Sequence, residues 1–519
     1  MKNKVRLIAI VLGIPIIAFI VAKGIELKYE SEWHSVLVQR FGILTSEQEE
    51  FLSLRNICAD PERSTKLGEA CSIYNQLIMM ERGALGAGTL GLSMLVIIAL
   101  AGHISRSNRK LLLTIFRPGL YLTVFASIIL ILVNAALAIA SIMFGEGALI
   151  GRVHGKIILL IGVGALVGVV AIAKASIKIV KKAKAVVVGE SLNETTNSVL
   201  WKFVADVAKK IGAGPPQHVI VGLTPNFFVT EADVSSVNGQ HQGRTMYLSL
   251  PLCRILTEDE LKAIIGHELG HFKGLDTQFS QKFYPIYKGT IDSLVAVSEH
   301  IGEGSWGLAL IPAFHILSYF FESFSVAESK ISRERELAAD RIAAEVAGTQ
   351  NIATALLKVH AFSGYWDSVL HLMRGTIEQG KQYINISSLF AEVVRVRVNT
   401  KHNSLQGLED QRLTHPTDSH PRLGLRLQTL GLSINNVADK SLQTSPQPQA
   451  IELIADYEEL EKRLTEVEHL LFIESGQATP KSAQVEQDRS QRKLCSDGNC
   501  VGTIDSKGVC SVCGKPYTG

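Results

Sequence analysis

The first 180 residues contain four apolar runs that approach the length needed to cross a lipid bilayer. About 20 helical residues span the roughly 30 Å hydrocarbon layer. The third run, Leu120–Phe144, is the clearest, because its 25 residues carry no charge and only Asn134 is strongly polar. The other runs are Leu7–Ala22, Gly83–Gly102 and Ile157–Ala173. The sequence therefore predicts a membrane domain over 1–180 with about four transmembrane helices.

The first run also has the features of a secretory signal peptide. Lys2, Lys4 and Arg6 form a basic segment ahead of a short apolar stretch, which is the pattern of a cleaved signal. This alternative does not alter the expected topology of the later spans. The loop that follows the first run lies outside the membrane in either case.

Lysine and arginine gather at three ends of the apolar runs. Basic residues near span ends mark the cytoplasmic side of a membrane protein. With four spans, all three clusters fall on one side; they lie at 2–6, 106–117 and 174–184. Everything after the fourth span is therefore predicted to be cytoplasmic, and the loop 24–82 to be extracytoplasmic.

The predicted outer loop contains two of the seven cysteines, Cys58 and Cys71. Disulfides form in oxidising compartments outside the cytoplasm, so a bond between these two residues is predicted. Two unrelated free thiols are the alternative, because no spacing rule identifies a single disulfide.

The composition excludes several classes of protein. Hydrophobic residues make up 47% of the 519 residues and charged residues 19%, which is too apolar for a disordered chain. The mean hydropathy of +0.21 is high for a soluble enzyme. A net charge of +3 gives no electrostatic excess that would attract nucleic acid, so no nucleic-acid partner is expected.

The part of the chain after residue 180 alternates between helical and strand-like patterns. A capping box at Thr257 to Glu260 opens the best-marked helix, which is expected to end near Gly274. The apolar run Trp306–Phe321 is interpreted as a core or membrane-abutting helix, with a fifth span as the alternative. The other predicted elements are helices over Ser191–Gly212, from just after Ser332 to Gly348, and over Ile451–Phe472, and strands over His218–Leu223, Asn226–Val234 and Thr245–Leu250.

The capped helix carries the sequence His267-Glu268-Leu269-Gly270-His271. Histidines four residues apart lie on one helix face, so both imidazoles can bind a single zinc ion. Glu268 between them can take a proton from a zinc-activated water, which is metalloprotease chemistry. The alternative is a helix whose histidines face solvent. The cap and the apolar opposite face favour the metal site.

A catalytic zinc site usually has three protein ligands and one open position. Glu336 is predicted as the third ligand, because it precedes Asp340 by one helical turn on a face of small residues that can approach the first helix closely. Asp340 is predicted to orient one of the ligand histidines. Glu334 and Glu345 remain alternatives for the ligand.

These segments resemble the HtpX-like membrane gluzincin metallopeptidases, the family that also includes the CAAX prenyl proteases. The resemblance covers about residues 190–431 and rests on Gly266–Phe272, Ile331–Asp340, and Ser419-His420-Pro421 with Arg426. It implies a mostly helical zinc protease fold packed on membrane helices, with Glu336 as third ligand. It also implies that substrate strands lie along an edge strand near 225–228. A second His-Pro pair at His415 leaves the alignment of the last motif ambiguous.

The resemblance points to this last motif as the source of a catalytic donor to the oxyanion that forms during peptide hydrolysis. Pro421 fixes the backbone after His420, so either His420 or Arg426 can be held towards the zinc. In the alternative, His420 caps the following helix and Arg426 pairs with an acid such as Asp418.

The chain ends in four cysteines, Cys495, Cys500, Cys510 and Cys513, with the last two at the spacing of a zinc knuckle. This pattern predicts a small zinc ribbon, and the expected cytoplasmic location disfavours the alternative of two disulfides. The flanking lysines form no continuous basic patch, so a docking or structural role is expected. Two zinc ions per chain follow, one catalytic and one structural.

The predicted fold class is mainly α: multi-pass membrane helices, a helical gluzincin protease domain with a small β-sheet, and a C-terminal zinc ribbon. The predicted domains are the membrane domain 1–180, the metallopeptidase domain 190–440, a helix and flexible linker over 441–493, and the ribbon 494–519. The predicted function is that of a zinc endopeptidase in the cell membrane with a cytoplasmic active site. Its expected partners are the lipid bilayer and protein or peptide substrates, chiefly membrane proteins undergoing quality control or processing.

Two other functions remain open at this level. One is processing of prenylated or other defined peptides. The other is a membrane scaffold or sensor in which zinc is only structural. Glu268 argues against the scaffold, because a structural site does not need a carboxylate beside its ligands.

Overall fold

The computed structural model describes residues 2–149, 151–178, 184–279, 311–399, 407–410, 414–415, 418–419, 421–444 and 449–479, together with 283, 287, 291, 294, 295, 298, 495, 496, 500, 504, 508–510 and 512–517. The chain forms two compact units. One consists of Met1–Lys181 and Pro285–Glu328, and the other of Lys182–Tyr284 and Ser329–Gly519.

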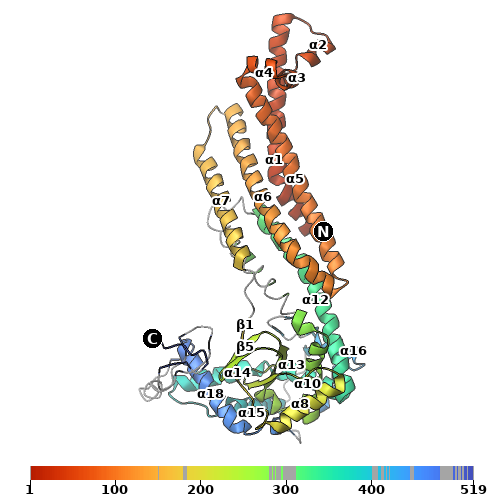
Figure 1. The fold of residues 1–519 in the computed structure, drawn as a ribbon, viewed down its shortest axis with the longest axis vertical. Coiled ribbons are helices and arrows are strands. Elements are labelled where there is room, and N and C mark those ends of the chain that lie inside the picture. The colour runs from red at the N-terminus through yellow and green to blue at the C-terminus, as the bar shows by residue number, and fades with distance from the viewer. Residues whose placement is uncertain are drawn as a thin grey trace. The chain divides into compact units, whose positions relative to one another are not determined.

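The first unit contains four long helices, labelled in Figure 1. They are α1 (Lys2–Phe41), α5 (Glu69–Ser105), α6 (Arg109–Leu149) and α7 (Gly155–Lys178). Each of the four predicted apolar runs lies within one of these helices, and all four are long and apolar enough to cross a membrane. Helices α1 and α5 pack closely through small residues: a Cβ atom on Gly91 would collide with the side chain of Val11.

Helices α1 and α5 continue well past the predicted spans. Helix α1 ends 19 residues after Ala22, which corresponds to an extension of roughly 28 Å. The short helices α2 (Ser46–Phe51), α3 (Leu54–Ala59) and α4 (Pro61–Leu67) connect the two ends (Figure 1). A disulfide joins Cys58 to Cys71, and the indole of Trp33 donates a 2.8 Å hydrogen bond to the carbonyl of Leu52.

The second unit contains a four-stranded sheet with the order β2-β3-β7-β4. Its strands are β2 (Gly189–Ser191), β3 (His218–Gly222), β4 (Phe228–Thr230) and β7 (Thr245–Ser249). The central pair β3 and β7 is parallel, and β2 and β4 pair antiparallel with it. Among the described strands, β4 therefore lies at the edge of this sheet. A smaller sheet has the order β1-β5-β6, with β1 (Lys184–Val186), β5 (Asp233–Ser236) and β6 (Gly239–His241).

Two of the predicted boundaries around these sheets are wrong. The predicted strand Asn226–Val234 is divided between β4 and β5, because the chain leaves the larger sheet after Thr230 and enters the smaller one at Asp233. The helix predicted from Ser191 starts at Ser198, since residues 189–191 pair with β3 as strand β2.

Helices form most of the remaining described residues of the second unit. They are α8 (Ser198–Ile211), α9 (Leu250–Cys253), α10 (Glu258–Lys273), α12 (Ile311–Ala347), α13 (Thr349–Phe362), α14 (Tyr365–Glu378), α15 (Ile386–Asn399), α16 (Leu423–Thr429), α17 (Ile434–Ser441) and α18 (Tyr457–Glu474). Part of α12, up to Glu328, belongs to the first unit. The predicted capping box of α10 is present: the carboxylate of Glu260 accepts the amide N–H of Thr257 at 2.8 Å.

The predicted separation of two helices between Phe321 and Ser332 is wrong, because α12 runs unbroken from Ile311 to Ala347. Polar residues interrupt the apolar pattern there, but no glycine or proline occurs between Pro312 and Gly348 to end the helix. Residues 306–310 of the predicted helix lie outside the described residues. The predicted mainly α fold class is confirmed.

Candidate active site

Helix α10 is anchored at its first turn by a buried ion pair. The Nζ atom of Lys358 on α13 lies 2.8 Å from the carboxylate of Glu260 and 2.9 Å from the carbonyl of Ile255. Only 1% of the Lys358 side chain is exposed. Burial lowers the pKa of Lys358, although the charge of Glu260 opposes this effect. The capping carboxylate of α10 is thus bound by α13 as well as by its own helix.

Glycines allow α10 and α12 to pack at close range. A Cβ atom on Gly266 would lie 3.4 Å from the Cα of Ala343, and one on Gly270 would lie 3.4 Å from the Cα of Ala339. Each glycine directly precedes a histidine of the predicted motif. The side chains of His267 and His271, which follow the two glycines, therefore lie close to α12.

Three of the predicted site residues converge between the two helices. The Nε2 atoms of His267 and His271 are 3.2 Å apart. The two carboxylate oxygens of Glu336 lie 3.4 Å from the Nε2 of His267 and the Nε2 of His271, respectively. Tetrahedral ligands at about 2.0–2.1 Å from zinc are themselves about 3.3–3.4 Å apart. The spacing and chemistry of these groups therefore fit a zinc site.

Asp340 lies behind the first histidine. Its Oδ1 atom is 2.9 Å from the Nδ1 of His267. Arg426 on α16 binds the same carboxylate through two nitrogens, with Nε at 2.9 Å and Nη2 at 2.6 Å. Burial disfavours the imidazolium of His267, but hydrogen bonds to Asp340 and Glu336 raise its pKa to about 10.

A second carboxylate, which was not predicted, lies behind the other histidine. The Oδ2 atom of Asp276 is 3.1 Å from the Nδ1 of His271, and its Oδ1 atom is 2.9 Å from Nε of Arg335. Burial disfavours the charged form of Asp276, yet the hydrogen bond with His271 and the charge of Arg335 lower its pKa. The only signal in the sequence was an aspartate five residues after the second histidine, and that spacing has no meaning until the turn after α10 is known.

The remaining predicted catalytic residues are placed as follows. Glu268 lies on α10 between the two histidines and is 9% exposed. His420 and the side chain of Asp418 lie outside the described residues. Arg426 is 1% exposed and is bound to Asp340, with its Nη2 atom 3.9 Å from a carboxylate oxygen of Glu336. The edge strand β4 lies against α10.

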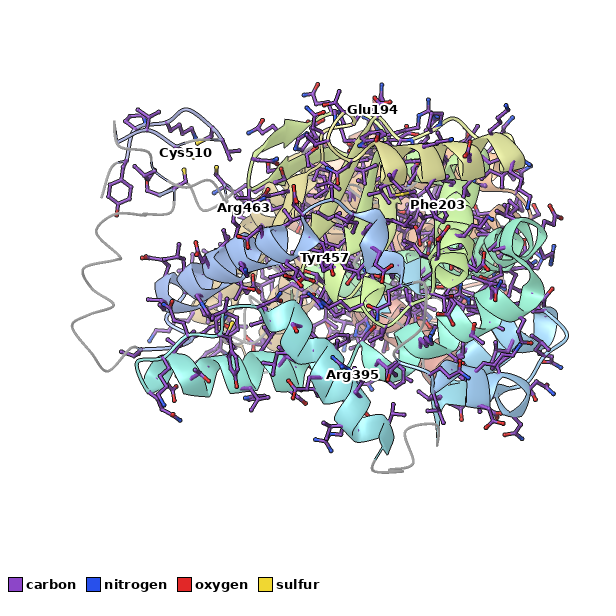
Figure 2. All side chains as sticks on the ribbon, turned by 90° about the horizontal axis from the view of Figure 1, so that it is seen from below. Glu194, Phe203, Arg395, Tyr457, Arg463 and Cys510 are labelled. Carbon is purple, nitrogen blue, oxygen red and sulfur yellow. A yellow bond between two sulfur atoms is a disulfide. The ribbon has the colours of Figure 1, made fainter. Side chains whose placement is uncertain are left out.

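The four C-terminal cysteines form a separate cluster, near the Cys510 label in Figure 2. The sulfur of Cys495 lies 3.4 Å from that of Cys513, and the sulfur of Cys500 lies 3.6 Å from that of Cys510. None of the four is in a disulfide. Burial disfavours the thiolate of Cys510, but hydrogen bonds from the backbone N–H groups of Cys513 and Val512 lower its pKa to about 7. Four thiols at this spacing fit a tetrahedral zinc ion.

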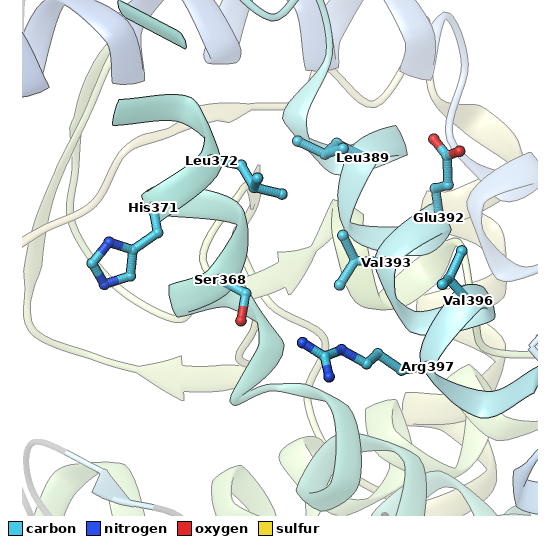
Figure 3. A pocket seen from close by; sticks show the side chains of 8 residues that line it. All are labelled: Ser368, His371, Leu372, Leu389, Glu392, Val393, Val396 and Arg397. Carbon is cyan, nitrogen blue, oxygen red and sulfur yellow. The ribbon is translucent and has the colours of Figure 1, made fainter. Parts of the chain in front are cut away.

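A groove of about 600 Å³ lies between α14 and α15 (Figure 3). Its walls are largely apolar and include Leu372, Leu389 and Val393, with Arg397 directed towards Ser368. The groove contains none of the site residues described above.

A helix with two histidines and a glutamate, completed by a buried glutamate from a second helix, defines the zinc metallopeptidase class in its gluzincin form. Residues 196–432 match the model of peptidase family M48. The expected resemblance to HtpX-like membrane metallopeptidases is confirmed.

The similar proteins are named as HtpX homologs. The chain is 33% identical over 168 residues to the protease HtpX homolog of Thermoplasma volcanium, covering 30% of this chain and 49% of that protein. It is 30% identical over 185 residues to the protease HtpX homolog 2 of Sulfurisphaera tokodaii, covering 31% and 50%. It is 28% identical over 179 residues to the protease HtpX homolog of Ralstonia pickettii, covering 34% and 60%.

The chain thus spans about half the length of the first two of these relatives. A search of the solved structures found no match. With four helices apolar enough to cross a bilayer, the chain is a membrane protein with a region that matches a metallopeptidase family.

Proposed function

We propose that this protein is a zinc-dependent endopeptidase that cleaves membrane proteins from the cytoplasmic side of the membrane, in quality control or processing. The observation that carries the proposal is the convergence of His267, His271 and Glu336, with Glu268 on the same helix as the histidines. A site that only stabilised the fold would use all its positions for protein ligands, whereas three ligands leave one position open.

The proposed reaction is hydrolysis of a peptide bond. The two histidines and Glu336 would hold the zinc ion, which would supply Lewis acidity for the water and for the scissile carbonyl. Glu268 accepts a proton from the attacking water and donates it to the departing amine, so that one carboxylate acts first as base and then as acid. We place an extended substrate along strand β4, which is the last strand of the larger sheet among the described residues and lies beside α10.

We assign Arg426 a positioning role in place of oxyanion binding. Two of its guanidinium nitrogens donate to Asp340, and the buried pair holds the carboxylate against His267. Its Nη2 atom is also near Glu336, so removal of the guanidinium changes the surroundings of two proposed ligands. His420 is retained as the proposed oxyanion donor.

The proposed orientation rests on the basic residues near the span ends. The clusters at 2–6, 106–117 and 174–184 favour a cytoplasmic location for the part of the chain that follows the last span. In this orientation the disulfide-linked loop is extracytoplasmic, which agrees with the redox chemistry of that side.

The decisive experiment compares wild-type protein with Glu268→Gln in cleavage of a panel of membrane proteins. Glutamine keeps the shape of the side chain and loses the base, so zinc content should stay at the wild-type level while cleavage is lost. Glu345→Gln, on the exposed part of α12, is the matched control and should cleave normally. Full cleavage by Glu268→Gln would refute the mechanism. Cleavage restricted to prenylated peptides would favour a dedicated processing protease, and no cleavage by wild type would favour the scaffold.

A further inference from the structure

In both histidines of the site, the ring nitrogen that points away from Glu336 is Nδ1, and it contacts an aspartate carboxylate. Nδ1 of His267 contacts Asp340, and Nδ1 of His271 contacts Asp276 at 3.1 Å. Asp340 lies on the same helix as Glu336, whereas Asp276 lies just beyond the end of α10. A carboxylate thus supports each ring, and the two carboxylates come from different elements.

Asp276 is itself fixed by an arginine. Its Oδ1 atom is 2.9 Å from Nε of Arg335, while its Oδ2 atom faces His271. The side chains of Asp276 and Arg335 are only 7% and 13% exposed, and the guanidinium lies 5.5 Å from the ring centre of Phe279. Arg335 directly precedes Glu336 on α12. This ion pair therefore connects the carboxylate that contacts His271 to the helix that carries Glu336.

The backbone adopts an unusual conformation to bring Asp276 to this position. Leu275 has φ of 57°, in the left-handed region that residues with a Cβ atom rarely adopt. A Cβ atom on Gly274 would lie 3.0 Å from the Oδ2 of Asp276, so glycine leaves the space that the carboxylate needs. Non-glycine residues are held at such φ values where the surrounding contacts require it, often at functional sites.

We infer that Asp276, held by Arg335, is a positioning residue that sets the tautomer and ring orientation of His271. This inference rests on the proposed function, since it takes His271 as a metal ligand. A carboxylate at Nδ1 keeps the proton on that nitrogen, which leaves the Nε2 lone pair directed at the point shared with His267 and Glu336. In this role Asp276 acts on the metal site through His271.

The test measures cobalt(II) affinity of the full-length protein in detergent. Cobalt at the cysteine cluster gives intense thiolate charge-transfer absorption, whereas cobalt bound by histidine and carboxylate gives only weak visible bands, so the two sites can be followed separately. Asp276→Ala should weaken cobalt binding at the histidine site by about 10- to 100-fold and leave binding at the cysteines unchanged.

Two further variants separate positioning from a purely structural role. Thr277→Val removes the 3.0 Å hydrogen bond to Glu231 from the adjacent residue and should leave cobalt affinity unchanged. Asp276→Asn with Arg335→Gln removes both charges together, so no charge is left buried without its partner. The double variant should recover thermal stability relative to Asp276→Ala, but its cobalt affinity should stay below that of wild type, because a neutral amide is a weaker acceptor for Nδ1–H.

Three results would contradict the proposed role of Asp276 or the metal site on which it depends. Wild-type cobalt affinity in the double variant, or an equal loss in Thr277→Val, would overturn it, because the effect would then belong to the stability of the segment. Wild-type protein without any cobalt at the histidines would overturn the proposed metal site, and the inference with it. A functional metal site with full affinity in Asp276→Ala would refute the inference alone.

Discussion

Gly270 lies against Ala339 so closely that the two helices of the site have no room between them for a side chain larger than a methyl group. The tightest contact that a Cβ atom on Gly270 would make is 3.4 Å, to the Cα of Ala339 and to a methyl group of Ile342. Alanine at position 270 is therefore at the limit of ordinary packing, and a branched side chain exceeds it.

We expect Gly270→Val to displace α12 and with it Glu336. Overpacking of a buried contact costs typically about 1–3 kcal/mol, and here the strain falls on a ligand helix. Zinc at the histidine site, measured as metal per protein, should decrease. Gly270→Ala is the control and should keep its zinc, because the gain in helix propensity of about 1 kcal/mol offsets the tight contact. Normal zinc content in the valine variant would show that the helices can separate without disturbing the site.

The C-terminal cysteines are expected to hold a second zinc ion. Cys510→Ser with Cys513→Ser should lower the metal content from two ions to one, and Glu336→Gln should remove the other ion. Alkylation detected by mass spectrometry provides an independent measurement. The four thiols should be protected in the purified protein and become reactive after a chelator is added. Reactivity that appears only after a reducing agent would instead indicate disulfides.

The pH dependence of stability should reveal the buried imidazole of His469 on α18. Burial lowers the pKa of His469 to about 4, and its Nε2 has no hydrogen-bond partner among the described residues. An unfolded histidine titrates near 6.5, so between about pH 6.5 and 4 only the unfolded chain binds this proton. Stability should thus fall as the pH decreases, by at most about 1.4 kcal/mol per pH unit, and should not change on this account above pH 6.5.

The neighbouring Glu468 should have the opposite effect on stability as the pH decreases, so it serves as a control for the His469 prediction. Burial raises its pKa to about 7, so from pH 7 down to the unfolded value near 4.3 the folded protein holds a proton that the unfolded chain releases. Melting temperatures at pH 7.5 and pH 5 test both assignments. His469→Leu should lose less stability on acidification than wild type, and Glu468→Gln should lose more. Identical shifts in all three proteins would contradict both.

The orientation of the chain can be tested with reporters. A fluorescent protein that folds only in the cytoplasm should be active when fused after Gly519, and an enzyme that is active only after export should work when inserted between Cys58 and Cys71. Basic residues near the span ends are the physical reason for this expectation. The reverse pattern would also remove the argument for free thiols in the C-terminal cluster.

The sequence predicted those parts of the fold that depend on local periodicity. Four apolar runs and the capping box before α10 needed no knowledge of distant contacts, and the pair His267 and His271 follows from the helical repeat alone. Asp276 could not be predicted, because its contact with His271 depends on the left-handed conformation of Leu275. The division between β4 and β5 also depends on pairing with strands far away in the chain.

The ion pair between Lys358 and Glu260 should dominate the stability of the start of α10. Loss of one partner from a buried pair costs about 3–5 kcal/mol, because the other charge remains buried alone. Lys358→Met should therefore lower the unfolding midpoint strongly. Adding Glu260→Gln should restore most of the loss, since glutamine at this position still completes a capping box. A double variant as unstable as Lys358→Met would show that the lysine contributes through packing rather than charge.

The same ion pair limits which substitutions at positions 260 and 358 can be tolerated during evolution. A chain that loses either charge first passes through a poorly folded intermediate, whereas a simultaneous change of both is tolerated. Positions 260 and 358 should therefore vary together among descendants of this sequence, although 98 residues separate them. Such covariation would arise from a contact that takes no part in catalysis, so coupled change at these positions is no evidence of altered substrate choice.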